Sequence, residues 1–256
     1  MKTVLLAGGL GTRISELTYQ IPKPMVEVGD KPILWHIMNL YSHYGFHEFV
    51  IALGYKAEVI KGYFLHYYEK SGDLTVDLRS GKIITHNKEA PDWKIHLVDT
   101  GLHTQTGGRI KRLKKWIGNE TFLLTYGDGV ADIDLPALVA FHKKHKKLAT
   151  VTAVRPPARF GALEIEDTHV TQFSEKSPSK EGWINGGFFV LEPEIFDFIH
   201  GDETAWEKDP LEALAKAREL TAYCHHGFWQ PMDTLRDHRH LEHLWITGQA
   251  PWKIWQ

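Results

Sequence analysis

The sequence has a single cysteine, Cys224, and almost no net charge. A lone cysteine cannot form an internal disulfide, so we expect a reducing, cytoplasmic setting. A formal net charge of -2 lacks the basic excess of proteins that bind long nucleic acids, whose affinity comes mainly from neutralising phosphates. We therefore expect no nucleic-acid partner.

Long apolar runs are also absent. The first run, residues 3–7, is too short for a signal peptide, and no stretch approaches the ~20 apolar residues of a membrane span. We expect no membrane partner and interpret this run as a buried strand. Signatures of serine or cysteine nucleophiles are missing, and so is His-Glu-x-x-His among the 16 histidines. We therefore expect neither covalent catalysis nor a histidine metal site.

What is present suits a globular α/β protein. A chain of 256 residues with 43% hydrophobic residues can bury a sizeable core. In the first half, apolar spacing alternates between strand and helix patterns, and this order predicts parallel strands. The predicted strands are residues 3–7, 48–53, three short strands within 73–98, 121–126 and 149–154. The predicted helices are residues 33–44, 57–68, 110–117 and 134–145.

The pattern changes after residue 155. Short strands at 162–165, 170–173 and 187–191 indicate an antiparallel extension or a sub-domain. Helices at 193–199, 205–218 and 233–246, with a strand at 220–224, complete the chain. With no internal repeat or long linker, the simplest prediction is one α/β domain, residues 1–256. It would have a mixed, mostly parallel central sheet flanked by helices, with a small antiparallel extension.

A glycine-rich loop, Gly8 to Arg13, directly follows the first predicted strand. It lacks the third glycine of a dinucleotide fingerprint, since Ile14 stands there, and it is not a P-loop. Bare backbone N–H groups in such a loop can approach an anion, and Thr12 and Arg13 add a hydroxyl and a guanidinium. The residues alone leave open a tight turn or a phosphate-binding loop. The loop of residues 104–109, which ends in a cation, is a second candidate for contacting a base or a phosphate.

Three further charged residues are candidates for chemistry. Lys23 lies between Pro22 and Pro24, so it is either a second cation presented by a stiff loop or a surface lysine. Asp128 follows the strand 121–126, at the sheet edge where α/β proteins bind ligands, and its carboxylate suits Mg²⁺. Asp233 precedes the last predicted helix, where it is either the N-cap or a second metal ligand.

Together, residues 8–13 and 22–26 resemble the signature of the sugar-1-phosphate nucleotidyltransferase family. The match continues in the family's order through residues 31–34, 54–56, 126–129, 175–176 and 185–189. Within that family, residues 35–38, 106–109, 159–163 and 227–234 are most similar to the cytidylyltransferases. Thymidylyl- and uridylyltransferases are less similar at these points.

The resemblance implies a GT-A-like, Rossmann-like fold and a reaction of CTP with glucose 1-phosphate that gives CDP-glucose and pyrophosphate. It implies that residues 1–155 bind mainly the nucleotide and residues 156–256 mainly the sugar phosphate. The implied cofactor is Mg²⁺, held by Asp128 and Asp233, and the implied catalytic residues are Arg13, Lys23 and Asp128. The implied nucleotide-binding residues are Leu6, Ala7, Gly8, Gly9, Leu10, Gly11, Thr12, Arg13, Lys23, Thr104, Gly108, Arg109, Gly127 and Asp128. The implied sugar-phosphate residues are Tyr126, Gly161, Glu175, Lys176, Asn185 and Gly186.

Two alternatives stay open at this stage. The chain could use another nucleotide or hexose phosphate, or it could bind a nucleotide sugar without turnover. The tryptophans of the tail, Trp245, Trp252 and Trp255, indicate either a subunit interface or packing within one chain. We expect a homo-oligomer.

Overall fold

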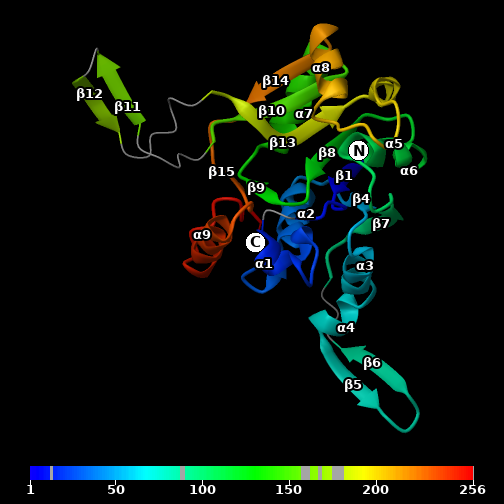
Figure 1. Ribbon diagram of the computed structural model, residues 1–256. Coiled ribbons are helices and arrows are strands. Elements are labelled where there is room, and N and C mark those ends of the chain that lie inside the picture. Colours follow the sequence, from blue (N-terminus) through cyan, green and yellow to red (C-terminus); the bar gives the residue numbers. More distant parts are fainter. Residues whose placement is uncertain (12–13, 87–89, 157–161, 167–168, 175–181, 256) are drawn as a thin grey trace.

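The computed structural model of the chain describes residues 1–11, 14–86, 90–156, 162–166, 169–174 and 182–255. Its centre is a seven-stranded sheet (Figure 1). The strand order, from one edge to the other, is β14 (Leu220–Cys224), β10 (Ala149–Val154), β13 (Ile184–Leu191), β8 (Phe122–Tyr126), β1 (Thr3–Leu6), β4 (Glu48–Leu53) and β7 (Lys94–Asp99).

The strands of this sheet are mostly parallel. β1 pairs in parallel with β4 and with β8, and β7 continues the parallel run beyond β4. β14 pairs in parallel with β10. β13 runs antiparallel to both of its neighbours, β8 and β10. The predicted fold class, a mixed and mostly parallel sheet flanked by helices, is confirmed.

The assignment of residues 187–191 to an antiparallel extension is wrong. These residues belong to β13, in the middle of the main sheet. Phe188 to Leu191 are all buried, because strands with helices on both sides of the sheet have no solvent face. The extension that does form is a separate hairpin of β11 (Ala162–Glu166) and β12 (His169–Ser174).

Helices cover both faces of the sheet. Val4 and Leu5, neighbours on β1, belong to different core clusters, as the alternation of a pleated strand requires. Helices α2 (Ile33–His43) and α7 (Leu135–His145) pack on the Leu5 side of the sheet. The helices on the Val4 side are α5 (Thr106–Arg112), α6 (Lys114–Ile117), the 3-10 helix η4 (Pro193–Phe198) and α8 (Asp209–Lys216).

None of the helices within the described ranges is long and apolar enough to cross a membrane.

Three predicted helices differ from the structure by more than two residues at an end or are divided in two. The helix expected at 57–68 is two helices, α3 (Ala57–Leu65) and α4 (Tyr67–Ser71), which meet at His66. The helix expected to begin at residue 205 begins only at Asp209. The helix expected at 110–117 is likewise two helices, α5 and α6, and the first begins at Thr106, so its first turn contains two glycines. A Cβ on Gly107 would lie 2.7 Å from the Thr204 carbonyl oxygen, so close packing explains glycines that are otherwise unfavourable in a helix.

Small elements complete the fold. The hairpin of β5 (Asp73–Asp77) and β6 (Lys82–His86) projects from the body, as does β11–β12 (Figure 1). The remaining elements are α1 (Ser15–Thr18), the 3-10 helix η2 (Lys23–Met25), α9 (Leu235–Ile246), and the short pairs β2 (Glu27–Val28) with β3 (Lys31–Pro32) and β9 (Gly129–Ala131) with β15 (Trp229–Pro231).

The tryptophans of the tail pack within the chain. The rings of Trp245 and Trp252 stack, and Trp252 is buried to 1% exposure. Trp252 Nε1 donates to His36 Nδ1 at 3.4 Å, and His36 Nε2 donates to the Val28 carbonyl at 2.8 Å. Burial lowers the pKa of His36 to about 4, so its ring is neutral around neutral pH. Of the two open alternatives for Trp252, packing within one chain is the one observed.

Candidate active site

A pocket of about 750 Å³ lies at the carboxyl ends of β1 and β8. Ligands of open α/β sheets bind at this edge, and the volume suits a small molecule. Its lining consists of residues 6–11, 23–24, 102–106 and 126–128, with Arg109, Asn185, Glu207, Trp229, Pro231 and Asp233.

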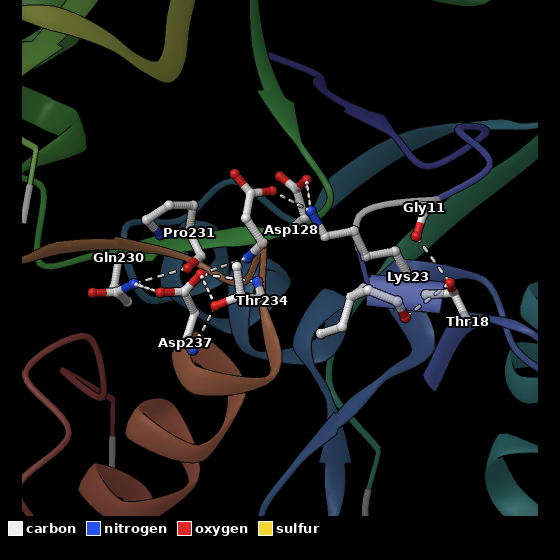
Figure 2. A network of polar contacts seen from close by, with 10 residues as sticks. Gly11, Thr18, Lys23, Asp128, Gln230, Pro231, Thr234 and Asp237 are labelled. Atoms are coloured by element: carbon white, nitrogen blue, oxygen red, sulfur yellow. Dashed lines mark hydrogen bonds and ion pairs between the residues drawn. The ribbon is translucent and has the colours of Figure 1, made fainter. Parts of the chain in front are cut away.

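The glycine loop forms one wall of the pocket. The Ala7 N–H donates to the Ala52 carbonyl at 3.0 Å, and the Gly8 carbonyl accepts from Tyr55 N–H at 3.1 Å, which fixes the loop to the end of β4. Gly11 has a φ of 65°, which favours glycine. Its carbonyl accepts from the Thr18 hydroxyl at 2.9 Å (Figure 2). The loop therefore makes a tight turn and also borders the pocket, and its binding of phosphate stays a prediction. Thr12 and Arg13 lie outside the described residues.

Arg109 lies beneath this loop. Its side chain is buried, and burial lowers the pKa of its guanidinium from the ordinary value. A Cβ on Gly8 or on Gly54 would lie within 2.4 Å of Arg109 Nη1, so the two glycines make room for the guanidinium. Nη2 donates to the carbonyls of Gly8 (2.9 Å) and Leu102 (3.2 Å), and Nη1 donates to Leu53 O (3.1 Å), Thr100 Oγ1 (2.8 Å) and Gly101 O (2.7 Å). Arg109 thereby ties the glycine loop to the loop of residues 101–102.

Some residues of the candidate loop 104–109 line the pocket, and others lie in the core. Thr104 lines the pocket and is buried to 8% exposure. Gly108 lies in α5, outside the pocket lining, where a Cβ would meet Asp202 Cα at 2.6 Å. Gln105 and Thr106, which belong to the candidate loop of residues 104–109 but had no role of their own, also line the pocket, and so do Leu102 and His103, which were not predicted.

Lys23 holds two distant carboxylates together. Its Nζ lies 2.7 Å from Asp128 Oδ2 (Figure 2) and 2.6 Å from Asp233 Oδ1. Lys23 is buried, and it begins the 3-10 helix η2 directly after Pro22, whose ring restricts the backbone there. Asp128 lies two residues after the end of β8, at the sheet edge where it was predicted. The alternative of an unattached surface lysine is wrong.

Local structure explains how Asp233 reaches this point. β15 pairs with β9, and the Met232 N–H donates to the Asp128 carbonyl at 2.8 Å, so residues 128 and 233 run side by side. The N-cap of α9 is Thr234, which forms a capping box with Asp237. Capping by Asp233, one of its two open roles, is therefore wrong, and its carboxylate faces Lys23 instead.

The two carboxylates suit a divalent cation. Within the described ranges no group of three or more His, Cys, Asp and Glu side chains gathers to hold a metal. Asp128 and Asp233 nevertheless converge on one positive charge inside the pocket. Mg²⁺ prefers oxygen ligands and often takes only one or two carboxylates together with substrate phosphates. The donor set therefore fits a metal that binds with a phosphate-bearing substrate.

The residues expected at the sugar phosphate lie on β8 and β13. Tyr126 and Asn185 line the pocket, and Asn185 Nδ2 donates to the Tyr126 hydroxyl at 3.4 Å. Gly186 lies just outside the lining, where its carbonyl accepts from Trp229 Nε1 at 2.7 Å. Gly161, Glu175 and Lys176 lie outside the described residues.

Glu207 and Trp229 are pocket residues that the sequence did not reveal. Glu207 accepts hydrogen bonds from Tyr126 at 2.7 Å and from Thr106 at 2.6 Å. It precedes a helix in a segment of ordinary charged residues, so no local pattern distinguishes it. Trp229 belongs to residues 227–234, which resemble the cytidylyltransferases, but the resemblance implied no role for this side chain.

Comparisons with known proteins agree with this geometry. Residues 2–234 match the family described as Nucleotidyl transferase. The chain is 53% identical over 257 residues to "Glucose-1-phosphate cytidylyltransferase" of Salmonella typhi, covering 100% of both sequences. It is 48% identical over 256 residues to "Probable glucose-1-phosphate cytidylyltransferase" of Bacillus subtilis, again covering 100% of both. Among solved structures, apo UDP-glucose pyrophosphorylase is similar, with a TM-score of 0.68, 19% identity and coverage of 97% of this chain and 99% of that one. At 19% identity, this similarity shows only that the two proteins share a fold.

Proposed function

The chain belongs to the nucleotidyl transferase family, and from that premise we propose that it joins CTP to α-D-glucose 1-phosphate, with CDP-glucose and pyrophosphate as products. Identity of 53% over the whole length of a curated glucose-1-phosphate cytidylyltransferase supports this choice of substrates. The observation that carries the reaction type is the placement of Lys23 between Asp128 and Asp233, beside a glycine loop in one pocket.

The chemistry needs no protein nucleophile. An oxygen of the sugar phosphate attacks the α-phosphorus of CTP in line, the bond from that phosphorus to the bridging oxygen breaks, and pyrophosphate leaves. Catalysis then depends on positioning two anions and on neutralising their charge. In the proposal Lys23, the buried ammonium of the pocket, counters the repulsion between the α-phosphate and the sugar phosphate.

The nucleotide is assigned to residues 1–155. The backbone of Leu6 to Gly11 would border the phosphates and ribose, with Thr12 and Arg13 adding a hydroxyl and a cation to the departing pyrophosphate. Thr104 and Gly127 line the same pocket. In this proposal Arg109 and Gly108 act beneath the nucleotide, Arg109 by holding the Gly8 carbonyl and Gly108 by close packing of α5.

The sugar phosphate is assigned mainly to residues 156–256. Asn185 lines the pocket there, and Tyr126 reaches it from β8. Gly161, Glu175, Lys176 and Gly186 complete the proposed set through the family resemblance.

Members of this family generally use a divalent metal. We assign Mg²⁺ to Asp128 and Asp233, whose carboxylates fit an oxygen-preferring ion. When bound, the metal would supply positive charge that stabilises the phosphates as the leaving group departs. Asp128 and Asp233 hold and orient this charge.

A panel of nucleotides tests the proposal. Release of pyrophosphate is measured with Mg²⁺ and glucose 1-phosphate in the presence of CTP, UTP, dTTP or ATP. Since rigid polar groups that pair with one base leave another unpaired, we expect CTP to exceed the others by about 100-fold or more in kcat/KM. A preference for dTTP or UTP would identify a sister enzyme. Tight binding of CTP without pyrophosphate release from any hexose 1-phosphate would identify a non-catalytic binding module.

The proposal includes assembly as a homo-oligomer in the cytoplasm. Leu74, Val76 and Ile83 are 42%, 49% and 53% exposed on the β5–β6 hairpin, and Val76 pairs with Ile83. Two-stranded hairpins are marginally stable alone, and exposed apolar faces mark contact surfaces. A second copy of the chain is the proposed cover for this face. The lone cysteine, Cys224, is compatible with the reducing conditions of the cytoplasm, which is the proposed location.

A further inference from the structure

Glu207 is a carboxylate of the pocket that the proposed chemistry does not yet use. Its Oε1 accepts from the Tyr126 hydroxyl at 2.7 Å, and its Oε2 accepts from the Thr106 hydroxyl at 2.6 Å. The preceding residue, Trp206, is fully buried, and its backbone N–H donates to Thr106 Oγ1 at 2.8 Å. Glu207 is thus held in one orientation although its side chain is exposed to the pocket.

The charge of Glu207 limits what it can bind. Asp128 and Asp233 share the ammonium of Lys23, whereas no cation pairs with Glu207 within the part of the chain that the structure describes. The Tyr126 hydroxyl, which lies 2.7 Å from Oε1, donates to this carboxylate and leaves its charge in place. An uncompensated carboxylate repels phosphates and accepts hydrogen bonds from hydroxyl groups. Glu207 therefore suits a neutral, hydroxyl-bearing part of a substrate.

Its position favours the sugar over the nucleoside. Tyr126 ends β8, two residues before Asp128, and its hydroxyl accepts from Asn185 on β13. The glycine loop follows β1, on the other side of β8. Thr106 joins this network from the loop of residues 104–109, whereas Tyr126 and Asn185 extend it toward β13, away from the glycine loop assigned to the phosphates.

We propose that Glu207 accepts a hydrogen bond from a ring hydroxyl of the sugar 1-phosphate and so helps to select the sugar. The inference rests on the proposed function, since it requires a sugar phosphate whose phosphate group lies near Lys23 and Asp128. Each carboxylate oxygen can accept more than one hydrogen bond, so the bonds from Tyr126 and Thr106 leave capacity for a substrate hydroxyl.

The test compares the wild type with Glu207→Gln, using glucose 1-phosphate and its 2-, 3-, 4- and 6-deoxy analogues. Because the charge of the acceptor is lost, we expect kcat/KM for glucose 1-phosphate to fall about 10- to 100-fold, while KM for CTP changes less than about twofold. For the one analogue that lacks the contacted hydroxyl, wild type and variant should give the same kcat/KM. Glu203→Gln, an exposed carboxylate of the same segment outside the pocket lining, should behave as the wild type throughout.

Two outcomes would overturn the inference. An equal loss with every deoxy sugar, reproduced by Tyr126→Phe, would give Glu207 a purely structural role. A loss confined to KM for CTP would assign it to the nucleoside. If Glu207→Gln melts at a much lower temperature than the wild type, Glu207→Asp replaces it, because that variant keeps the charge but withdraws it from the hydroxyl. Failure of the proposed function is distinguishable, since the wild type would then release no pyrophosphate from CTP and glucose 1-phosphate.

Discussion

The ammonium of Lys23 lies 2.6 Å from a carboxylate oxygen of Asp233, a residue 210 positions further along the chain. The same ammonium lies 2.7 Å from Asp128, so three segments meet at one buried positive charge. In the proposed reaction this charge faces the phosphates of both substrates.

Lys23→Met tests the role of this charge. The substitution keeps the length of the side chain but removes the ammonium, so two anionic substrates would approach without it. We expect kcat to fall by about 100-fold or more, since single electrostatic groups contribute on that scale. Steady-state kinetics with CTP and glucose 1-phosphate measure the effect. Lys216→Met, an exposed lysine of α8, is the matched control, and equal activities of the two variants would exclude Lys23 from catalysis.

Asp128→Asn and Asp233→Asn test the metal assignment. Each keeps the shape of the side chain but removes a charged oxygen ligand, so we expect Mg²⁺-dependent activity to fall by about 100-fold or more while the fold persists. Activity is titrated against Mg²⁺, and circular dichroism monitors the fold. Asp197→Asn, an exposed aspartate, should retain the wild-type Mg²⁺ dependence. An unchanged Mg²⁺ requirement in either site variant would remove that residue from the proposed metal site.

Arg109→Lys should destabilise the protein and weaken nucleotide binding. An ammonium cannot supply the forked donors that reach carbonyls on both loops, and buried carbonyls left unpaired are costly. We expect the free energy of unfolding to fall by about 3 kcal/mol and KM for CTP to rise. Urea denaturation and kinetics check both effects. Arg112→Lys, on the same helix, alters an exposed pair with Asp202 and should leave stability nearly unchanged.

His36 should make stability depend on pH. Its pKa is about 4 in the folded chain and 6.5 in the unfolded chain, so the unfolded state binds the proton more readily. The contribution of His36 is complete above pH 6.5 and is lost as pH falls toward 4, by about 3 kcal/mol at most. Urea denaturation between pH 4 and pH 8 should show this slope in the wild type and in His43→Gln, an exposed control on α2. The slope should flatten in His36→Gln; an unaltered slope would contradict the assignment.

The β5–β6 hairpin should control assembly. Val76→Lys places a charge on the apolar face shared with Ile83, so we expect the oligomer to dissociate to smaller species. Light scattering coupled to size-exclusion chromatography measures the mass. Thr75→Lys changes the opposite face and should leave the mass unaltered. A monomeric wild type at all concentrations would refute the assembly proposal.

The sequence predicted features that local chemistry determines. β4, β10 and β14 have the predicted bounds, because each is a short run of mostly apolar residues of strand length. Lys23 and Asp128 could be selected because prolines flank one and a strand precedes the other. The arrival of Asp233 beside them depends on the pairing of β15 with β9, which no local pattern encodes. Glu207 was missed for the same reason, since its role depends on the distant Tyr126 and Thr106.

The antiparallel strand in the middle of the sheet has a consequence for synthesis of the chain. β8 pairs with β1 on one side, but its other edge stays open until Ile184–Leu191 emerge from the ribosome and insert as β13. β10, although made earlier, joins the rest of the sheet only through the same strand. Open strand edges invite pairing with other chains, so the nascent protein remains vulnerable to aggregation until translation passes this segment. A fragment that ends before residue 184 would lack the link between the two groups of strands.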